Sequence, residues 1–494
     1  MHRALLISDI ILDIVQCCTI TDHRGLDIAD GESLARLART CRFFQEPALD
    51  ALWAELESIH PLIRCLPGDV WMRRGSTVFY KKYLSPRHWI TFHKYASRIR
   101  VLKLPKPLST TIQTLIALDD SPASAPLFPR LRHLEWFDTN AERLSYLRLF
   151  LAPSLVVLKA DLRGLSESDP NVLSSLHTIC PLIRTAVFTK VPESKEAVAA
   201  ISQAVCGWRH LQILQCDRLN KAAWAHVLRT PGLTVGDFHL PPRIAEFART
   251  AGVPSSSSDL FPSLSDLRLS SRNVNLATTL IEMMNHTPTT FQLIVEHTPS
   301  SQSIHALFNA LSERVVQSPS QLLLTGPDGD DPPVITLEKM EPLLNFSSLR
   351  VLEMDSFCTF FFDDEALTEM ALAWPNLETL WLYRKRWEVP SGITFQGLFS
   401  LVQLCPKLNR LALAFDATAM DSALPISYLN KVSNHAVKHL HVMDTHLDDP
   451  PVVALALLSL FAGLERVHYS DGELAELWDE VNVMLAEYRP TILA

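Results

Sequence analysis

The stretches LRVLEM, residues 349–354, and LETLWL, residues 377–382, share the pattern L-x-x-L-x-L and start 28 residues apart. The same pattern, or a close variant of it, recurs along most of the chain. Its copies start at Ile99, Leu131, Leu155, Leu182, Leu211, Val235, Leu264, Leu349, Leu377, Leu408, Val437 and Leu464. Recurrence at this period predicts a fold in which one strand-and-helix element is copied many times.

The spacing of the copies is regular, at 24 to 32 residues, except for one gap of 85 residues after Leu264. Two weaker copies, TTFQLIV around Thr290 and SQLLLTG around Gln321, divide that gap into three units of ordinary length. About fourteen units result. Leucine-rich repeats have this pattern and run about 20 to 29 residues, so these units are at or just above the long end of that range.

Each unit predicts one short strand whose leucines face inward and one helix that covers them. No unit can bury its apolar face alone, so the units must stack into a solenoid. Apolar helix patterns occur where this requires, at residues 171–180, 222–228, 366–374, 395–405 and 452–461. The Asn or Cys that usually follows the third leucine is mostly missing, which predicts irregular turns. The predicted fold class is α/β, with an irregular leucine-rich-repeat solenoid over residues 99–494.

Residues beside the second inward leucine of each strand should point away from the core, onto the concave face of the solenoid. These residues mix charge with one large aromatic side chain, which suits a surface that binds a protein target. The alternative for each of them is a solvated side chain without a partner. The predicted target-binding residues are Glu135, Lys159, Gln215, Arg268, Glu353, Trp381, His441 and His468.

Residues 1–60 form a second region, with three short helix patterns of i, i+3, i+4, i+7 spacing. Their apolar positions are Ile7, Ile10, Ile11 and Ile14, then Leu34, Leu37, Ala38 and Cys41, then Leu49, Leu52, Trp53 and Leu56. Ser8 is expected to cap the first helix and Pro47 to lie in the first turn of the third. Three such helices bury little surface, so this short all-α module should complete its core against another part of the protein.

The segments ISDIILDI at 7–14, SLARLARTCRFF at 33–44 and ALDALW at 48–53 resemble an F-box, with Ser8 where that family usually has proline. Segments at Tyr95, Asp363 and Ile393 resemble the later part of large fungal-type F-box families. The resemblance implies docking to the Skp-type adaptor of an SCF ubiquitin ligase. The implied adaptor-binding residues are Leu6, Ile7, Ile10, Ile11, Ile14, Leu34, Leu37, Ala38, Cys41, Phe44, Leu52 and Trp53.

Residues 61–98 are expected to be a basic and aromatic helical linker. From Trp71 to Lys103 there are nine Lys or Arg residues and no Asp or Glu, interleaved with aromatic residues. This composition could indicate a nucleic-acid surface. We favour a helix capped at Ser85–Pro86 that buries Trp89, Phe92 and Tyr95 and leaves its cations in solvent, because no nucleic-acid-binding motif accompanies the charge. A partner with an acidic surface would also suit it.

Composition limits the function further. The net charge of −9 and the pI of about 6.1 argue against nucleic-acid binding, and the longest apolar run, residues 452–464, is too short to cross a bilayer. Nine cysteines without a C-x-x-C pattern suggest reduced thiols, and the N-terminus lacks the features of a signal peptide. We therefore expect a cytoplasmic or nuclear protein that binds neither nucleic acid nor a membrane.

No motif of a catalytic or cofactor site occurs in the sequence. We interpret GPDGDD, residues 326–331, as an exposed turn rather than a calcium loop. His439 and His441 should share one face of a strand, as surface groups rather than as a metal pair. FCTFFFDD, residues 357–364, should pack in the core before a helix capped by Asp363 or Asp364, although an exposed docking site is an alternative.

Together these expectations describe a non-catalytic adaptor without cofactor or metal. It would bind a Skp-type adaptor, and through it a cullin-based ligase, with its F-box, and an unidentified protein target with its repeats. The alternative is an interaction scaffold that has a degenerate F-box and no role in ubiquitination.

Overall fold

The computed structural model consists of two compact units, Met1–Leu233 and Thr234–Ala494, which we describe separately. It describes residues 7–21, 27–74, 77–80, 84–104, 111–121, 126–165, 171–250, 260–313, 319–329, 331–384, 391–418, 433–470, 472 and 474–492. No helix in these ranges is both long enough and apolar enough to span a bilayer.

The first unit contains a parallel sheet in the order β10-β9-β8-β7-β6-β3. Its strands are β3 (Glu55–Leu56), β6 (Val101–Leu104), β7 (His133–Trp136), β8 (Val157–Asp161), β9 (Thr185–Thr189) and β10 (Ile213–Cys216). The helices that follow these strands are α6 (Ile112–Asp119), α7 (Ala141–Leu144), α8 (Asn171–Ser174), α9 (Leu176–Ile179), α10 (Lys195–Gly207) and α11 (Lys221–Val227), together with a 3-10 helix at Ser145–Phe150.

The second unit contains a parallel sheet in the order β21-β20-β19-β18-β16-β14-β13-β12-β11. Its strands are β11 (Val235–His239), β12 (Asp266–Ser271), β13 (Thr290–Val295), β14 (Gln321–Thr325), β16 (Val351–Asp355), β18 (Thr379–Tyr383), β19 (Arg410–Ala412), β20 (His439–Met443) and β21 (Arg466–Tyr469). Its helices are α12 (Ile244–Thr250), α13 (Val274–Glu282), α14 (Ser301–Glu313), α15 (Leu337–Met340), α16 (Asp364–Ala373), α17 (Phe395–Leu404), α19 (Pro450–Leu460) and α20 (Ala475–Ile492), with a 3-10 helix at Glu341–Asn345.

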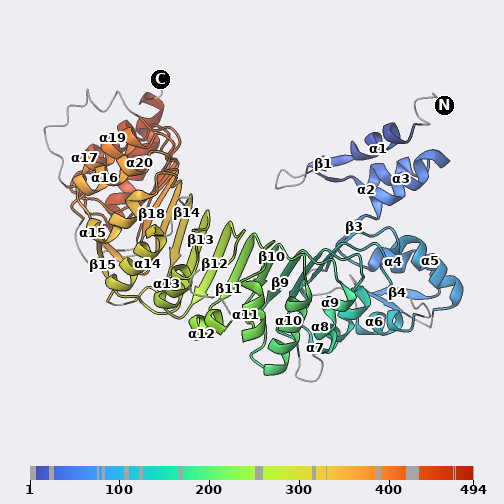
Figure 1. Ribbon diagram of the computed structural model, residues 1–494. Helices are drawn as coiled ribbons and strands as arrows, with labels where there is room; N and C mark the ends of the chain where they lie inside the picture. The colour runs from blue at the N-terminus through green and yellow to red at the C-terminus, as the bar shows by residue number, and fades with distance from the viewer. Residues whose placement is uncertain are drawn as a thin grey trace. The chain divides into compact units, whose positions relative to one another are not determined.

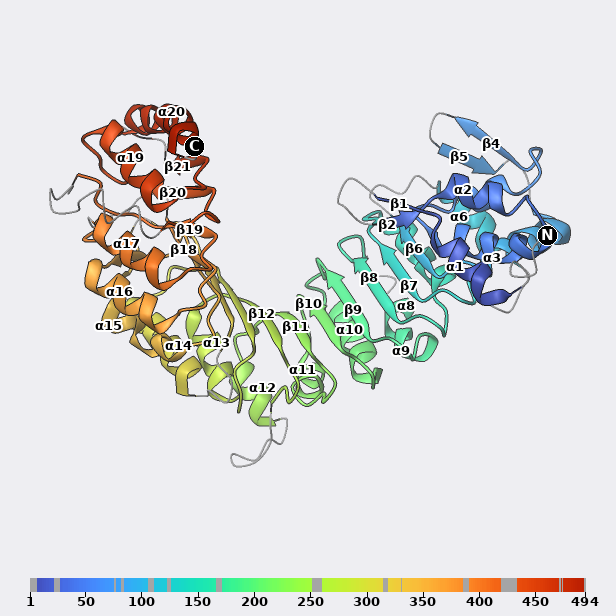
Figure 2. The ribbon, with the colours of Figure 1, turned by 90° about the horizontal axis from the view of Figure 1, so that it is seen from above.

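Every sequence repeat, including the two weak copies, coincides with one strand of these sheets. Along β16 and β18 the leucine-type positions Leu352, Met354, Leu380 and Leu382 are fully buried, and the residues between them are partly exposed. Each fully buried leucine contributes roughly 1.5–3 kcal/mol. Helices line up along one face of each sheet (Figures 1 and 2) and cover these leucines, which leaves an opposite, open face. The α/β class with leucine-rich-repeat-like units is thus confirmed.

The predicted helices are also present, as α8 and α9, α11, α16, α17 and α19. The Asp363 carboxylate caps α16 by accepting the Ala366 N–H at 2.8 Å. Before it, Phe357, Phe360 and Phe362 are buried, as expected, whereas Phe361 is 54% exposed. The segment around them forms β17 (Thr359–Phe361), which pairs in parallel with β15 (Val334–Thr336).

The N-terminal module contains α1 (Ser8–Gln16), α2 (Gly31–Leu37) and α3 (Arg42–Leu52), which pack around Val15, Leu34 and Ala48. An antiparallel ribbon of β1 (Thr19–Thr21) and β2 (Asp27–Ala29) adds to the three expected helices and occupies the long spacer between α1 and α2.

Four local predictions for this module were wrong. Ser8 is the first helical residue of α1 rather than its cap, and Pro47 lies inside α3, which begins five residues before it. Cys41 has an extended backbone as the N-cap of α3 and so does not continue α2. Leu56 lies in β3, where the sheet pairs it with Leu102. Pairing with β6 gives its backbone the hydrogen bonds that a helix would otherwise supply.

Residues between the module and the repeats form α4 (His60–Arg64), an antiparallel ribbon of β4 (Trp71–Arg74) and β5 (Thr77–Tyr80), and α5 (Pro86–Ala96). The N-terminus of α5 is capped as expected: Pro86 is its first residue and the Ser85 N–H donates to His88 Nδ1 at 3.1 Å. Trp89 and Phe92 are buried, and Tyr95 lies against Trp53 of the module with ring centroids 4.8 Å apart. The α5 helix therefore packs toward the module as well as toward the repeats.

Candidate functional site

The open face of each sheet carries the residues that the sequence predicts as target-binding. Strand register aligns Glu135, Lys159 and Gln215 with Lys103 and Val187 in one row of the first unit. In the second unit one row runs through Arg268, Gln292, Leu323, Glu353, Trp381, Ala412, His441 and His468. A fixed position in every repeat becomes a continuous line of side chains because neighbouring parallel strands pair in register.

In the first unit the row is held by ion pairs. Glu135 Oε1 lies 2.9 Å from Lys159 Nζ and 2.9 Å from His133 Nε2. Burial alone would raise the pKa of the Glu135 carboxyl, but Lys159 and His133 outweigh it and lower that pKa below its usual value. Glu135 is thus ionised and neutralised within the row, and Gln215 stands two strands away from Lys159.

In the second unit three residues of the row, Trp381, His441 and His468, belong to a contiguous group of rings. We call this group the ring array: Trp381, Tyr383, His439, His441 and His468, with the guanidinium of Arg410. The Arg410 Cζ lies 3.9 Å from the Trp381 ring centroid, and its guanidinium also pairs with the Glu353 carboxylate. The Trp381 ring also contacts the His441 imidazole, and the two ring centroids are 4.5 Å apart. Arg410 therefore reaches across β18 and links Glu353 to the array, while Arg268 lies several strands away on β12.

Three imidazoles continue the ring array. His441 stacks on His468, with centroids 4.4 Å apart and ring planes 15° apart, and His468 Nε2 lies 3.2 Å from His439 Nδ1. Burial, with the neighbouring His468, Arg410 and His439, lowers the pKa of His441 to about 4. Burial and His439 lower the pKa of His468 as well. His441 is therefore neutral at pH 7, and a perturbed titratable group of this kind is a marker of functional sites.

The backbone beside the array is irregular. Strand β20 contains a bulge between His441 and Met443 where it pairs with β21, and the buried Met443 has a positive φ of 53°. Bulges redirect side chains, and strained backbone persists where the surrounding structure enforces it. Both features lie next to His441 and His468. In the part of the chain that the structure describes, no three His, Cys, Asp or Glu side chains are grouped as metal ligands would be.

Sequence reasoning selected Trp381, His441 and His468 but assigned no role to Arg410 or Tyr383. His439 and His441 do share one face of β20, where His439 is exposed and His441 is partly buried. The signal that would have found Arg410 is its position at the start of β19, beside the strand that carries Trp381. GPDGDD forms part of a different contact: the buried Arg384 donates to the Gly329 carbonyl at 2.5 Å and lies 3.3 Å from the Asp328 carboxylate.

The residues implied as adaptor-binding divide into buried and exposed groups. Ile11, Leu34, Phe44 and Trp53 are buried within the first unit. Ile10, Ile14, Leu37, Ala38, Cys41 and Leu52 are partly buried, and Leu6 lies outside the described residues. Among the described residues, the large apolar side chains that the module exposes are Ile7, Leu12 and Phe43, at 51%, 49% and 54%. A partner would meet these first, and two of them, Leu12 and Phe43, were not among the implied residues.

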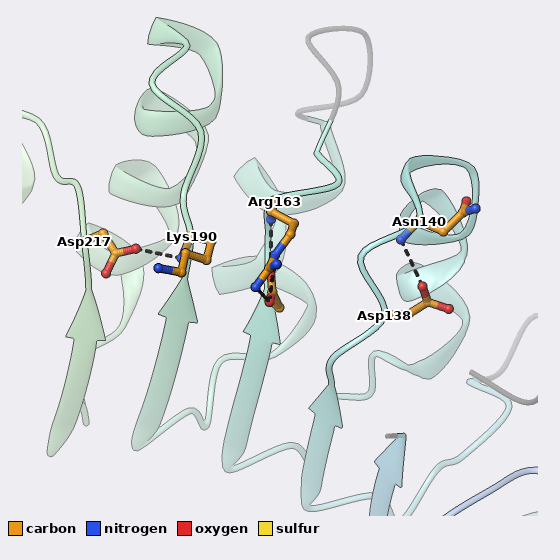
Figure 3. Close-up of polar contacts among 6 residues, drawn as sticks. Asp138, Asn140, Arg163, Lys190 and Asp217 are labelled. Carbon is orange, nitrogen blue, oxygen red and sulfur yellow. Dashed lines mark hydrogen bonds and ion pairs between the residues drawn. The ribbon is translucent and has the colours of Figure 1, made fainter. Parts of the chain in front are cut away.

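Besides the two open-face rows, a polar cluster lies at the carboxyl ends of β7 to β10 (Figure 3). The Asp138 carboxylate accepts the Asn140 N–H at 2.9 Å, and the Asp217 carboxylate accepts the Lys190 N–H at 2.6 Å. The Asp161 carboxylate pairs with the Arg163 guanidinium, Nη2 to Oδ2, at 2.8 Å. Each carboxylate binds a residue in the turn that follows a strand. The cluster therefore has a structural role in shaping the turns.

Comparisons with known proteins add little to this geometry. No family model matches the chain, and no curated protein matches it. Among solved structures the chain is similar to the crystal structure of the Rad7 and Elc1 complex in yeast. The two chains share 15% identity, the alignment covers 89% of this chain and 88% of that one, and the TM-score is 0.38. A likeness at this level assigns neither a family nor a partner to this chain.

Proposed function

We propose that the chain is the substrate-recognition subunit of an SCF-type E3 ubiquitin ligase. Its N-terminal module binds a Skp-type adaptor and, through it, a cullin-based ligase, and the open faces of its repeat sheets bind a protein target. The observation that carries the proposal is the F-box resemblance of residues 7–53, which fold as a small helical module with Ile7, Leu12 and Phe43 exposed. Exposed large apolar side chains are what an association surface requires.

In this role the chain makes and breaks no bond. It raises the effective concentration of target lysines near a ubiquitin-loaded enzyme, and transfer itself belongs to the partners. The work takes place in the cytoplasm or nucleus, without a cofactor. The alternative function is that of an interaction scaffold with no role in ubiquitination, and adaptor binding distinguishes the two.

Attachment of the module to the repeats supports tethering. The β3 strand of the module joins the sheet beside β6, and the Ala54 carbonyl accepts the N–H groups of Arg100 and Val101 at 2.8 and 2.9 Å. Lys103 also pairs with Glu55. A target held on the first sheet is therefore held at a defined position relative to the module.

The test is co-purification of the full chain with a Skp-type adaptor. Phe43→Asp and Leu12→Asp place a charge on the exposed apolar surface without touching the module core, so both should retain the fold. Burying an unpaired carboxylate in an interface costs several kcal/mol, so we expect capture to weaken by about 100-fold or more. The matched control is Ile90→Asp on α5, whose side chain is 72% exposed.

Capture by the intact chain and by Ile90→Asp, but not by the other two variants, would support the ligase role. Circular dichroism must show the same helix content in all four proteins. If the intact chain captures no adaptor, the ligase role is wrong and the scaffold function remains.

A further inference from the structure

We propose that the open face of β19, β20 and β21 binds an acidic, carboxylate-rich segment of a protein. That this segment belongs to a ligase target rests on the proposed function, but the binding itself rests on charge and geometry alone. The strands read RLA, HLHVM and RVHY and contain no Asp or Glu, in a chain whose net charge is −9. The surface is therefore a local concentration of positive and imidazole groups on an acidic protein.

Strand register sets three of these groups side by side. Arg410, His439 and Arg466 occupy equivalent positions on β19, β20 and β21. Arg410 is partly neutralised by Glu353, whereas Arg466 is exposed and has no ion-pair partner among the described residues. Adjacent strands lie about 4.8 Å apart, so an extended chain laid across them meets a cationic or imidazole group about every one and a half residues. Carboxylates are the natural partners of such a row.

A second row, Trp381, His441 and His468, lies beside the first. Its rings are already stacked on one another, and Arg410 covers the Trp381 ring. Single-stranded nucleic acid binds by stacking its bases on free aromatic faces, whereas here Arg410 covers a face of Trp381 and His441 and His468 cover a face of each other. Apart from His468 Nε2 and His439 Nδ1, which contact each other, the imidazole nitrogens can hydrogen-bond to the backbone and carboxylates of a peptide.

The groups around His441 contain no carboxylate that would stabilise its charged form. It faces Trp381 and Tyr383 from β18, Arg410 from β19 and His468 from β21, with His439 on its own strand. Arg466 of β21 acts on His468 instead. Three carboxylates of this region have other partners: Glu353 pairs with Arg410, Glu465 with Lys438, and Asp479 accepts from the Tyr469 hydroxyl. An acidic ligand would supply the missing counter-charge, so its binding should be coupled to proton uptake.

The proposal is tested with the full chain and a fluorescein-labelled six-residue peptide of alternating glutamate and serine, blocked at both ends. Fluorescence polarisation measures its Kd at pH 7.5 and pH 6.0 in low salt. Because binding takes up protons, we expect the Kd to fall by about three- to tenfold between these pH values. His441→Gln with His468→Gln should flatten this dependence, and Arg466→Gln should weaken binding by about tenfold.

The matched control is Arg268→Gln, an exposed arginine in the same open-face row as Trp381 but on β12. It lies five strand spacings, about 24 Å, from β19. A six-residue peptide spans at most about 21 Å, so one bound on β19 to β21 cannot reach Arg268. This control should bind the peptide as tightly as the unchanged chain.

Equal affinity for a peptide with lysine in place of glutamate would overturn the proposal. So would tighter binding of a six-nucleotide single strand, an equal loss in Arg268→Gln and Arg466→Gln, or no binding at millimolar peptide. Adaptor capture separates the two hypotheses. Capture without peptide binding contradicts the acidic-segment site alone, and peptide binding without capture contradicts the ligase role alone.

Discussion

The guanidinium of Arg98 donates to the carboxylate of Asp50, which lies 48 residues earlier in the chain, and so connects the end of α5 to helix α3 of the N-terminal module. A second nitrogen of the same guanidinium pairs with Glu46, also on α3. The Arg98 side chain is only 10% exposed, whereas the side chains of Glu46 and Asp50 are 62% and 40% exposed. Part of the basic stretch between Trp71 and Lys103 is thus used inside the protein.

Replacing Arg98 with Ala should loosen the module from the repeats. Hydrogen bonds to charged groups contribute about 1.5–3 kcal/mol each, so the amides that pair β3 with β6 should exchange about 10- to 100-fold faster. Hydrogen exchange monitored by mass spectrometry measures this directly. The control is Arg36→Ala, which removes the pair between Arg36 and Glu32, whose side chains are 70% and 73% exposed. An unchanged exchange rate in Arg98→Ala would show that these ion pairs do not stabilise the attachment of the module to the repeats.

Gly397→Ala should destabilise the second unit, although Gly-to-Ala changes inside helices usually stabilise by about 1 kcal/mol. A Cβ on Gly397 would clash with the Asp364 carboxylate. That carboxylate already accepts the Thr394 N–H at 2.7 Å and the Gly397 N–H at 2.9 Å, so it cannot move away freely. We expect a loss of about 2 kcal/mol in urea unfolding. Gly472→Ala, which meets no atom within 4 Å, is the control, and a stabilised Gly397→Ala would contradict the argument.

Lys190→Gly should stabilise the first unit. Lys190 has a φ of 57° in the turn after β9, a left-handed conformation that costs a residue with a Cβ about 1 kcal/mol. Glycine removes that cost and keeps the backbone N–H that donates to Asp217 (Figure 3). After the entropy of glycine in the unfolded chain is subtracted, about 0.5 kcal/mol should remain, visible as a higher Tm. Lys195→Gly at the start of α10 should lower the Tm instead.

Stability should fall between pH 6.5 and pH 4 because of His441. The pKa of its imidazole is about 4 in the folded protein and 6.5 in the unfolded chain. Between pH 4 and pH 6.5 the unfolded chain binds more protons than the folded protein. The contribution of neutral His441 to stability is therefore complete above pH 6.5 and is lost as the pH falls toward 4. Between pH 7 and pH 5, the Tm of the His441→Gln variant should therefore fall less than the Tm of the unchanged protein. His435→Gln, at an exposed site outside the ring array, should behave like the unchanged protein.

The leucine spacing predicted the strands β6 to β14, β16 and β18 to β21 of the repeat sheets, but not β3. Burial in a strand alternates with each residue, so Leu380 and Leu382 identify their strand without reference to the rest of the chain. The same alternation placed Trp381 on the open face. Register between equivalent repeats then brought Trp381 and His441 onto one line, as the sequence predicted, because every repeat contributes its strand in the same direction.

Other features depended on contacts between residues far apart in the chain. Phe43 and Phe44 are neighbours of the same type, yet packing in the module buries Phe44 and leaves Phe43 exposed. Leu56 continues a helical pattern, but pairing with Leu102 makes it a strand. Which carboxylate Arg98 would meet, and which ring Arg410 would cover, could not be read from local sequence. Local periodicity determined the repeating elements, whereas side-chain partners were decided by packing and register, which join residues about 30 to 60 positions apart only after the chain has folded.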